Sequence, residues 1–191
     1  MRKVILSTNM TLDGFFAGPN NELDWTVADE ELHDFYSDLL QNADLLIFGR
    51  VTYLMMREYW PTAASDPSLP AGMLRFANTI NSNRKLVFSK TLKEVDWNTE
   101  LQHEIDAEEI RSLKAQPGKY ILVSGSNVGN QFLSNGWVDE IRLVIMPVAI
   151  GQGKPFFGAL RQGIELELNW TKTMNSGAVA LCYRVKGQSQ K

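Results

Sequence analysis

The sequence has little cysteine and histidine, and it contains no long apolar run. A single cysteine, Cys182, excludes an internal disulfide and a metal site built from several thiolates. The two histidines, His33 and His103, have no partner at a spacing typical of metal ligands, so we predict that both lie on the surface and that no metal is bound. No apolar stretch approaches the roughly 20 residues that span a membrane, and the first residues turn polar too early for a signal peptide. We therefore expect a cytoplasmic protein.

Concentrated charge of one sign is also missing. The formal net charge of the 191 residues is -3, and no block of Lys and Arg is longer than two residues. This argues against the basic surface typical of proteins that bind nucleic acid or anionic membranes, so small molecules are the expected partners. Hydrophobic residues make up 44% of the chain, which is enough for a core. We expect one domain over residues 1–186 and a disordered tail over 187–191.

Four short apolar runs in the first two thirds of the chain each end in a small or polar residue. Such runs are typical of strands buried on both faces of a parallel sheet, and the helical patterns between them favour βαβ crossovers. The expected strands are Lys3–Thr8, Asp44–Phe48, Lys85–Ser89 and Lys119–Ser124. The clearest helix covers residues 26–42, with Thr26 as N-cap and Asp29 as its capping-box partner. Asp106 and Glu109 repeat this signal before a second helix.

The last third of the chain contains strand patterns alone. Glu140–Ile150 predicts one long strand, and Glu165–Met174 and Ala178–Lys186 flank a three-residue loop typical of a hairpin, which places Cys182 in the core. The stretch Trp60–Gly72, with three prolines, predicts a loop. The sequence therefore predicts an α/β fold with helices on both faces of a mostly parallel sheet and an antiparallel C-terminal hairpin.

Polar turns follow three of the expected strands, and two of these turns contain glycine. Glycine lets a backbone approach a phosphate, a helix N-terminus offers free N–H groups, and Arg or Lys adds positive charge. Lys90 between two hydroxyls suits a ribose 2′-phosphate, which favours NADP over NAD. Ligands of parallel sheets bind at the carboxyl ends of the strands, so the coincidence of three turns favours an anionic cofactor over ordinary surface turns. The residues are Gly49, Arg50 and Thr52; Ser89, Lys90 and Thr91; and Ser124, Gly125, Ser126, Asn127 and Val128.

The glycine fingerprint of Rossmann dehydrogenases is absent. Gly151-Gln152-Gly153-Lys154-Pro155-Phe156 lacks the third glycine and does not open a helix, so a tight loop between strands explains it.

A glycine-punctuated loop, Asn9–Gly18, follows the first strand and could cover a flat ring. Acidic residues in and after this loop are candidates to hold a cationic nitrogen of a heterocycle, and Asp13, Asp29 and Glu30 are the catalytic candidates. Two alternatives stay open: Asp29 also fits a cap partner, and Glu30 fits a surface charge that favours the helix dipole.

An ordered series of short motifs along nearly the whole chain resembles the dihydrofolate-reductase-like superfamily. It is most similar to stand-alone bacterial proteins related to the C-terminal reductase domain of the riboflavin-biosynthesis deaminase/reductase. The motifs are Leu12-Asp13-Gly14, Phe48-Gly49-Arg50-x-Thr52-Tyr53, Tyr59-Trp60-Pro61, Ser89-Lys90-Thr91-Leu92, Gly125-Ser126, Gly136-x-Val138-Asp139-Glu140-x-Arg142-Leu143 and Pro147-x-x-x-Gly151-x-Gly153-Lys154-Pro155-x-Phe157.

This resemblance implies a three-layer fold with a central eight-stranded sheet and NADPH across the strand ends. It implies hydride transfer to a small heterocycle, as in the riboflavin-pathway 5-amino-6-(5-phosphoribosylamino)uracil reductase, with a pterin reductase such as dihydrofolate reductase as the alternative. Gly49, Arg50 and Thr52 would meet the cofactor phosphates, Ser89–Thr91 the adenosine side and Gly125–Val128 the pyrophosphate, while Asn9, Phe16 and Ala17 would border the nicotinamide. A carboxylate at the start of the first helix, Glu30 or Asp29, would hold the substrate ring.

Two departures from these relatives bear on the substrate. Ser124-Gly125-Ser126 replaces the paired glycines of folate reductases, and Asp66-Pro67-Ser68-Leu69 lies farther along the chain than the substrate-phosphate segment of riboflavin reductases. The second departure disfavours a ribose-phosphate substrate. A non-catalytic NADPH-binding module is the alternative of another class. The apolar run Ile141–Ile150 suits a homodimer contact, and a central strand explains it equally well.

Overall fold

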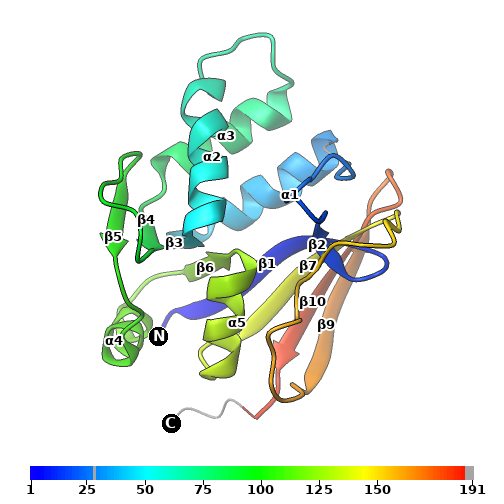
Figure 1. Cartoon of the computed structure of the whole chain (residues 1–191). Coiled ribbons are helices and arrows are strands. Elements are labelled where there is room, and N and C mark those ends of the chain that lie inside the picture. Colours follow the sequence, from blue (N-terminus) through cyan, green and yellow to red (C-terminus); the bar gives the residue numbers. More distant parts are fainter. Residues whose placement is uncertain (28, 188–191) are drawn as a thin grey trace.

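A computed structural model describes residues 1–27 and 29–187, and it contains an eight-stranded sheet with helices on both faces (Figure 1). The predicted α/β class is confirmed. The strand order is β5-β4-β3-β6-β1-β7-β10-β9, and a separate two-stranded sheet pairs β2 with β8. The strands are β1 (Lys3–Thr11), β2 (Phe15–Ala17), β3 (Ala43–Gly49), β4 (Lys85–Phe88), β5 (Thr99–Gln102), β6 (Tyr120–Ser124), β7 (Glu140–Met146), β8 (Lys154–Pro155), β9 (Leu166–Thr173) and β10 (Val179–Val185). The helices are α1 (Glu30–Gln41), α2 (Arg50–Ala63), α3 (Ala71–Ser82), α4 (Ala107–Ala115) and α5 (Ser126–Ser134).

The sheet is parallel from β5 to β7 and turns antiparallel at β10. The β9–β10 hairpin therefore lies where the sequence predicts it, and Cys182 is fully buried on β10. Strand β7 pairs with β1 on one side and β10 on the other. Because β7 is a central strand, its apolar run is accounted for within the chain. Of the tail predicted over 187–191, residues 188–191 lie outside the described residues.

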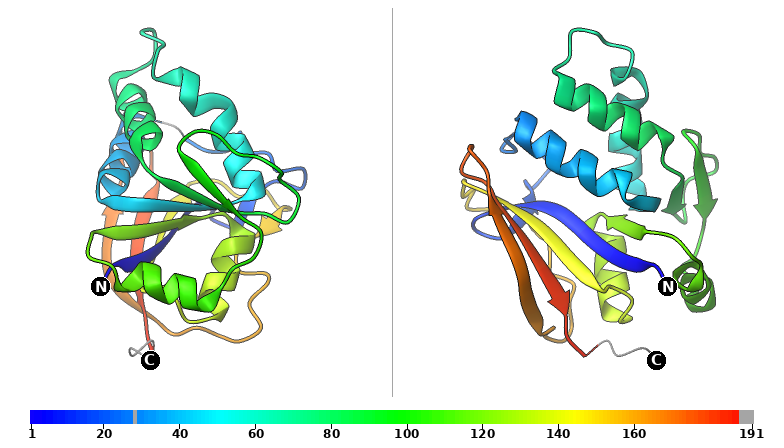
Figure 2. Two further views of the ribbon diagram at one scale, coloured as in Figure 1. Left: turned by 90° about the vertical axis from the view of Figure 1, so that its left-hand side faces the viewer. Right: turned by 180° about the vertical axis from the view of Figure 1, so that it is seen from behind.

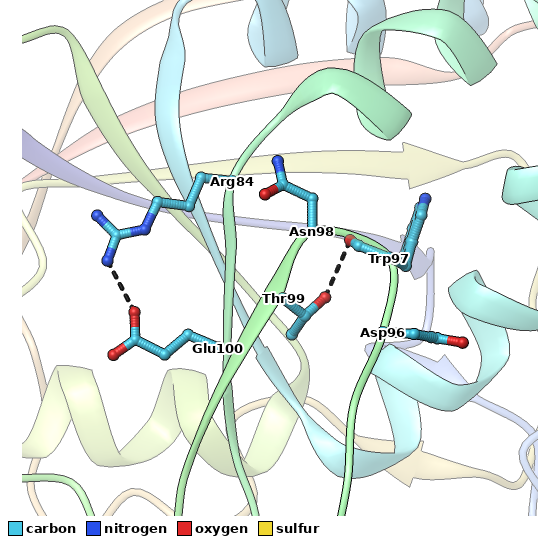
Figure 3. A pocket seen from close by; sticks show the side chains of 6 residues that line it. All are labelled: Arg84, Asp96, Trp97, Asn98, Thr99 and Glu100. Atoms are coloured by element: carbon cyan, nitrogen blue, oxygen red, sulfur yellow. Dashed lines mark hydrogen bonds and ion pairs between the residues drawn. The ribbon is translucent and has the colours of Figure 1, made fainter.

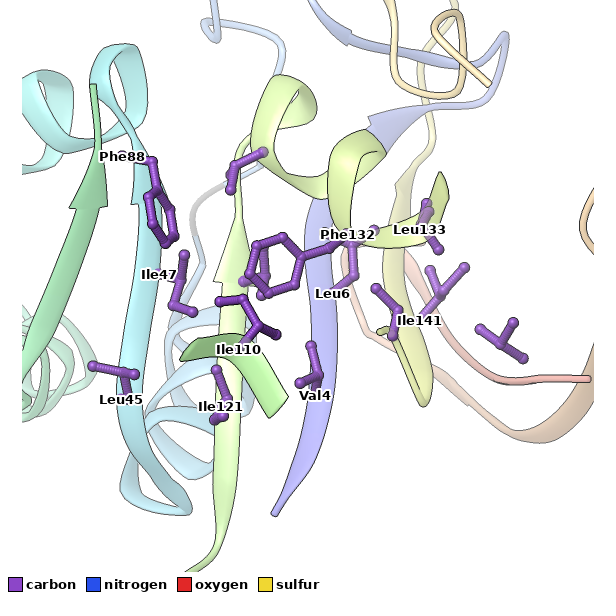
Figure 4. Packing of buried hydrophobic residues seen from close by; sticks show 14 of the residues in the cluster. Val4, Leu6, Leu45, Ile47, Phe88, Ile110, Ile121, Phe132, Leu133 and Ile141 are labelled. Atoms are coloured by element: carbon purple, nitrogen blue, oxygen red, sulfur yellow. The ribbon is translucent and has the colours of Figure 1, made fainter. Parts of the chain in front are cut away.

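Helices lie on both sides of the sheet (Figure 2), and an apolar layer of side chains covers each face. Successive side chains of a strand point to opposite faces, so a strand buried on both faces needs a continuous apolar run. On one face, Ile110 of α4 and Phe132 of α5 pack over Val4, Leu6 and Ile121 (Figure 4). On the other face, α1, α2 and α3 pack over alternate residues of the same strands, including Ile5, Leu46, Val87 and Leu122. This packing holds the carboxyl ends of the central strands at one edge.

Four sequence predictions about element boundaries are wrong. Strand β1 continues to Thr11, three residues past the predicted end, and the predicted loop Asn9–Gly18 contains the short strand β2. Helix α1 begins at Glu30, not at Thr26, because the Asp29 side chain accepts a hydrogen bond from the Leu32 amide at 2.8 Å and is itself the N-cap. Helix α2 continues to Ala63 through part of the predicted loop, since Pro61 lies in its last turn. Strand β7 ends at Met146 because Pro147 follows and has no N–H for the ladder. Asp106 caps α4 as predicted, through the Glu109 amide, but the Glu109 carboxylate bonds to Gln102 instead of back to the cap.

None of the helices in the described ranges combines the length and apolar character needed to cross a bilayer.

One buried cation lies at the amino end of β4, remote from the carboxyl edge. The side chain of Lys85 is fully buried; its Nζ donates to the Asn83 carbonyl at 2.8 Å and lies 4.1 Å from the Trp97 ring centroid. Burial lowers the pKa of Lys85 to about 8, while the carbonyl and the aromatic ring favour the charged form and limit the cost.

Replacing Lys85 with methionine is expected to stabilise the fold. An apolar side chain of similar length removes the desolvation cost, so the free energy of unfolding at neutral pH should rise by about 1–3 kcal/mol. The folded pKa lies below the unfolded value of 10.5, so wild-type stability should increase as pH rises from about 8 to about 10.5, and Lys85→Met should lack this increase. Urea unfolding across this range measures both effects. Equal pH dependence in the two proteins would contradict the assignment.

Candidate active site

The three predicted polar turns lie side by side at the carboxyl edge of the sheet. Strands β4, β3 and β6 are consecutive and parallel, so the turns at Ser89, Gly49 and Ser124 end at the same edge. The first and last of these strands are separated only by β3, and a Cβ on Gly49 would lie 3.9 Å from the Val128 side chain. The turns after β3 and β6 therefore touch, as a ligand that contacts both requires.

The two helices that start at this edge have N-termini without side-chain caps. Helix α2 starts after Gly49 and α5 starts after Gly125, and neither cap position makes a side-chain hydrogen bond. By contrast, Asp29 and Asp106 cap α1 and α4. The first N–H groups of a helix have no partner within the helix and carry partial positive charge. Two adjacent uncapped N-termini form a cradle that suits the phosphates of a dinucleotide.

Gly125 makes this cradle possible. Its backbone adopts φ 108° and ψ 134°, a conformation open essentially to glycine. A Cβ at this position would lie 2.7 Å from Thr52 Oγ1, closer than carbon and oxygen approach. The absence of a side chain therefore brings the turn after β6 against the start of α2.

The polar side chains of the turns differ in whether they already form ion pairs or hydrogen bonds within the chain. Arg50 is exposed and forms no ion pair with the described residues, and Lys90 is exposed with Glu104 at 4.0 Å. Ser89 Oγ instead accepts from the amides of Thr91 and Leu92 at 3.2 and 3.1 Å. Ser126 Oγ donates to the Phe156 carbonyl at 3.3 Å, and Asn127 Oδ1 accepts from Gln131 at 3.0 Å. In the turn after β6, the first amides of α5 are thus more available to a ligand than the side chains of Ser126 and Asn127. In the turn after β4, Ser89 Oγ already takes two of the backbone amides.

A cavity of about 300 Å³ opens beside these turns. It brings together six of the predicted residues from β1, the β2 segment, α2 and the turn after β6: Asn9, Phe16, Ala17, Thr52, Ser124 and Gly125. The opposite wall is largely apolar and comes from α1, α2 and α3, with Leu32, Met55, Met56, Trp60 and Phe76. The volume is at the low end for small-molecule sites, which suits one flat ring beside a nicotinamide. Whether the predicted residues bind a ligand stays a prediction.

A small polar cluster lies where β1 meets α1 in this cavity. Tyr36 donates its phenolic hydrogen to Asn9 Oδ1 at 2.6 Å, and burial raises the pKa of Tyr36, so the phenol stays protonated. The nearby Ser7 hydroxyl is buried, lines the cavity and has no hydrogen-bond partner among the described residues. This cluster holds Asn9 in one orientation and leaves polar groups for a ligand.

The three predicted catalytic carboxylates are not among the residues that line the cavity. A hydrogen bond from the Thr11 side chain lowers the pKa of Asp13, and the amides of Ile150 and Gly151, which donate to Asp13 Oδ2 at 3.0 and 2.7 Å, lower it further. Asp29 caps α1, and the exposed Glu30 lies 3.6 Å from Arg75. Each carboxylate therefore has a structural partner, and an orienting role for any of them stays a prediction.

His33 corrects the prediction of a surface histidine. It is 9% exposed, and its ring packs edge-on against Phe76 because α3 lies against α1. Gly72 permits this contact, since a Cβ there would lie 3.3 Å from His33 Cβ. His33 and Tyr36 line the cavity together. The sequence pattern missed His33 because it does not show which helix packs beside α1. His103 is exposed as predicted.

A second hollow lies at the opposite edge, at the amino ends of β4 and β5. Figure 3 shows its lining: the Arg84–Glu100 ion pair at 2.8 Å and the Thr99 hydroxyl that donates to the Trp97 carbonyl at 3.1 Å. These polar groups bond to one another, and the hollow is open to solvent. Ligands of parallel sheets bind at the carboxyl ends instead.

Within residues 1–27 and 29–187, no group of three or more His, Cys, Asp or Glu side chains could hold a metal ion.

Residues 2–180 match the sequence profile of the RibD C-terminal domain. The chain belongs to this family. It is 35% identical to the uncharacterized Bacillus subtilis protein YyaP over 97% of this chain and 96% of that one. Members of the RibD C-terminal domain family are reductase-like, and the fold agrees with solved reductase structures.

Two solved structures illustrate the agreement. A putative riboflavin biosynthesis protein from Shewanella sp. PV-4 superposes with a TM-score of 0.76 at 21% identity, covering 96% of this chain and 99% of that one. Dihydrofolate reductase from Enterococcus faecalis superposes with a TM-score of 0.63 at 14% identity, covering 96% of each chain. The chain thus has the dihydrofolate-reductase-like fold that its motifs predict.

Proposed function

We propose that this protein is an NADPH-dependent reductase that transfers a hydride to a small heterocycle of the pyrimidine or pterin type. The observation that carries the proposal is the pair of adjacent uncapped helix N-termini, at Gly49 and Gly125, beside a cavity of about 300 Å³. Membership in the RibD C-terminal domain family supports it, as does the fold shared with a dihydrofolate reductase that was solved with NADP(H).

The residues of the carboxyl edge fit such a cofactor by their chemistry. The amides at the starts of α2 and α5 would hold the pyrophosphate, and Arg50 and Lys90 would meet the 2′-phosphate side. Asn9, Phe16 and Ala17 would border the nicotinamide. Bound NADPH would supply the hydride, and the chain would contribute orientation and exclusion of water by the apolar wall.

The experiment that tests the proposal is calorimetric titration of NADPH and NADH into the wild type and Arg50→Ala. Arg50 is exposed and has no ion-pair partner in the described part of the chain, so its removal should cost little stability. We expect NADPH affinity to fall by about tenfold and NADH affinity to change by less than about threefold, as loss of a charge-assisted hydrogen bond to a phosphate implies. Glu58→Ala, another exposed position on α2, is the matched control. A folded wild type that does not bind NADPH would refute the proposal.

A second candidate is a non-catalytic NADPH-binding module, because fold alone does not fix function. The absence of a carboxylate among the described cavity-lining residues favours it. Oxidation of NADPH with any pyrimidine, pterin or quinonoid acceptor would exclude this candidate. A homodimer through Ile141–Ile150 also stays a proposal, and sedimentation would decide it.

A further inference from the structure

The cavity wall, as far as the structure describes the chain, offers a ligand no charged carboxylate, ammonium or guanidinium. Among the described residues that line it, the polar side chains are hydroxyls, amides, a phenol, the Trp60 indole, whose N–H lies 3.1 Å from Met56 Sδ, and one imidazole, that of His33. An ionic ring or a phosphate buried there would have no opposite charge, and burial of an unpaired charge is costly. The lining therefore favours an uncharged ligand.

The hydrogen-bond partner of His33 fixes which nitrogen of the neutral imidazole carries the proton. Nδ1 lies 2.7 Å from the Asp29 carbonyl oxygen, which can only accept, so Nδ1 bears the hydrogen. In the neutral ring Nε2 is then an acceptor. Nε2 makes no hydrogen bond to any residue in the described ranges. A ligand N–H is the group that such a nitrogen recognises.

The orientation of this imidazole is held on two sides. The Phe76 ring lies edge-on with its centroid 6.2 Å away, and Gly72 lets the start of α3 approach the helix backbone beside His33. The nearby charges face each other outside the cavity wall, where Arg75 pairs with Asp34 and with Glu30. The neutral imidazole is thus held in place as an acceptor, in a wall whose described side chains carry no formal charge.

We propose that His33 determines the specificity of the acceptor site, and that its Nε2 accepts a hydrogen bond from a ring N–H of an uncharged heterocycle. This inference rests on the proposed function, because it treats the cavity as the place of the hydride acceptor. His33 takes the orienting role that the resemblance to folate reductases assigns to a carboxylate, Glu30 or Asp29. The ligand carries no phosphate or carboxylate group inside the cavity.

The test uses two rings that differ in whether two ring nitrogens carry hydrogen or methyl, and the His33→Leu variant separates the loss of a hydrogen bond from the added bulk. Lumazine has uncharged ring N–H groups, and in 1,3-dimethyllumazine methyl groups replace both. With NADP⁺ present, we expect lumazine to bind at least about tenfold more tightly, because the dimethyl ring leaves Nε2 unpaired. His33→Leu should weaken lumazine by about tenfold and leave dimethyllumazine unchanged. His33→Gln, whose amide oxygen can still accept, should retain most of the difference. The Asp29 carbonyl keeps its bond from the His33 amide at 3.1 Å, so α1 should stay folded in both variants.

Imidazole NMR signals give a readout that does not depend on turnover. The chain has two histidines, and His33→Leu identifies the signal of His33 by its loss. Lumazine should shift the His33 signal more than that of His103, which lies at the end of β5 with Nδ1 2.8 Å from the Ser89 carbonyl. Equal binding of the two lumazines, or tighter binding of cationic 2,4-diaminopyrimidine than of either, would overturn the inference. Failure of NADPH binding in calorimetry would instead refute the proposed function, so the two failures are distinguishable.

Discussion

Gly125→Ala is expected to destabilise the fold by about 2–4 kcal/mol and to abolish tight NADPH binding. A side chain at φ 108° costs roughly 1–3 kcal/mol of backbone strain, and its Cβ would also collide with Thr52 Oγ1 at 2.7 Å. Relief of this collision would separate the turn after β6 from the start of α2, which form the proposed phosphate cradle. Urea unfolding and calorimetry measure the two effects.

A second substitution separates strain from collision. The Cβ at position 125 would lie 3.6 Å from Thr52 Cβ, an ordinary contact, so Thr52→Ala should recover the collision part of the loss and leave the strain. Gly163→Ala is the matched control, since a Cβ there meets nothing within 4 Å. If Gly125→Ala were as stable as Gly163→Ala, the proposed role of Gly125 would be wrong.

The strand-end turns could be predicted because their signals are local. An apolar run followed by glycine and polar residues marks a strand and its end, and neither requires knowledge of distant contacts. What the pattern does not contain is strand order. Only the strand order of the folded sheet shows that β4, β3 and β6 are consecutive. Each turn alone is a weak indication of a ligand site, but this order places all three at one edge.

The helical wall of the cavity could not be predicted, because it depends on contacts between segments that are distant in the sequence. It depends on α3, which starts at Ala71 after a proline-containing stretch that resembles a loop. Pro61 lies in the last turn of α2, where its missing N–H removes one of the last hydrogen bonds of the helix, and the helix ends two residues later. Without α3 there is no Phe76 or Gly72 beside α1, and His33 looks like a surface residue.

The candidate carboxylates show how one side chain fits two roles in a sequence. Asp29 matches a cap and a substrate-binding acid equally well by spacing. In the structure the Leu32 amide, which has no acceptor within the first turn of the helix, donates a hydrogen bond to the Asp29 carboxylate at 2.8 Å. Since helix N-termini need acceptors whether or not a ligand is present, the local bond is satisfied first.

Glu140→Ala is expected to cost about 3–5 kcal/mol of stability, the largest loss that we predict for a single charge. Glu140 Oε1 lies 2.6 Å from Lys3 Nζ, and Oε2 lies 2.9 Å from Arg142 Nη2. The side chains of Glu140 and Arg142 are 7% and 15% exposed, and Arg142 lies over the rings of Tyr120 and Trp170. Removal of the carboxylate leaves the Arg142 charge buried without a partner. Urea unfolding should show this loss, whereas Glu167→Ala, which removes the exposed partner of Arg184, should cost less than about 1 kcal/mol.

The same carboxylate should make the fold sensitive to acid. Burial raises the pKa of Glu140, but hydrogen bonds and charge from Lys3 and Arg142 outweigh it, so the folded pKa lies below the ordinary value of 4.5. A lowered folded pKa gives stability that is complete above the unfolded pKa and is lost as pH falls through the folded one. Glu140→Gln cannot titrate, so its free energy of unfolding should fall less steeply than that of the wild type below a pH of about 4.5. Parallel acid curves for the two proteins would show that Glu140 is not the charge that holds Arg142 in the sheet.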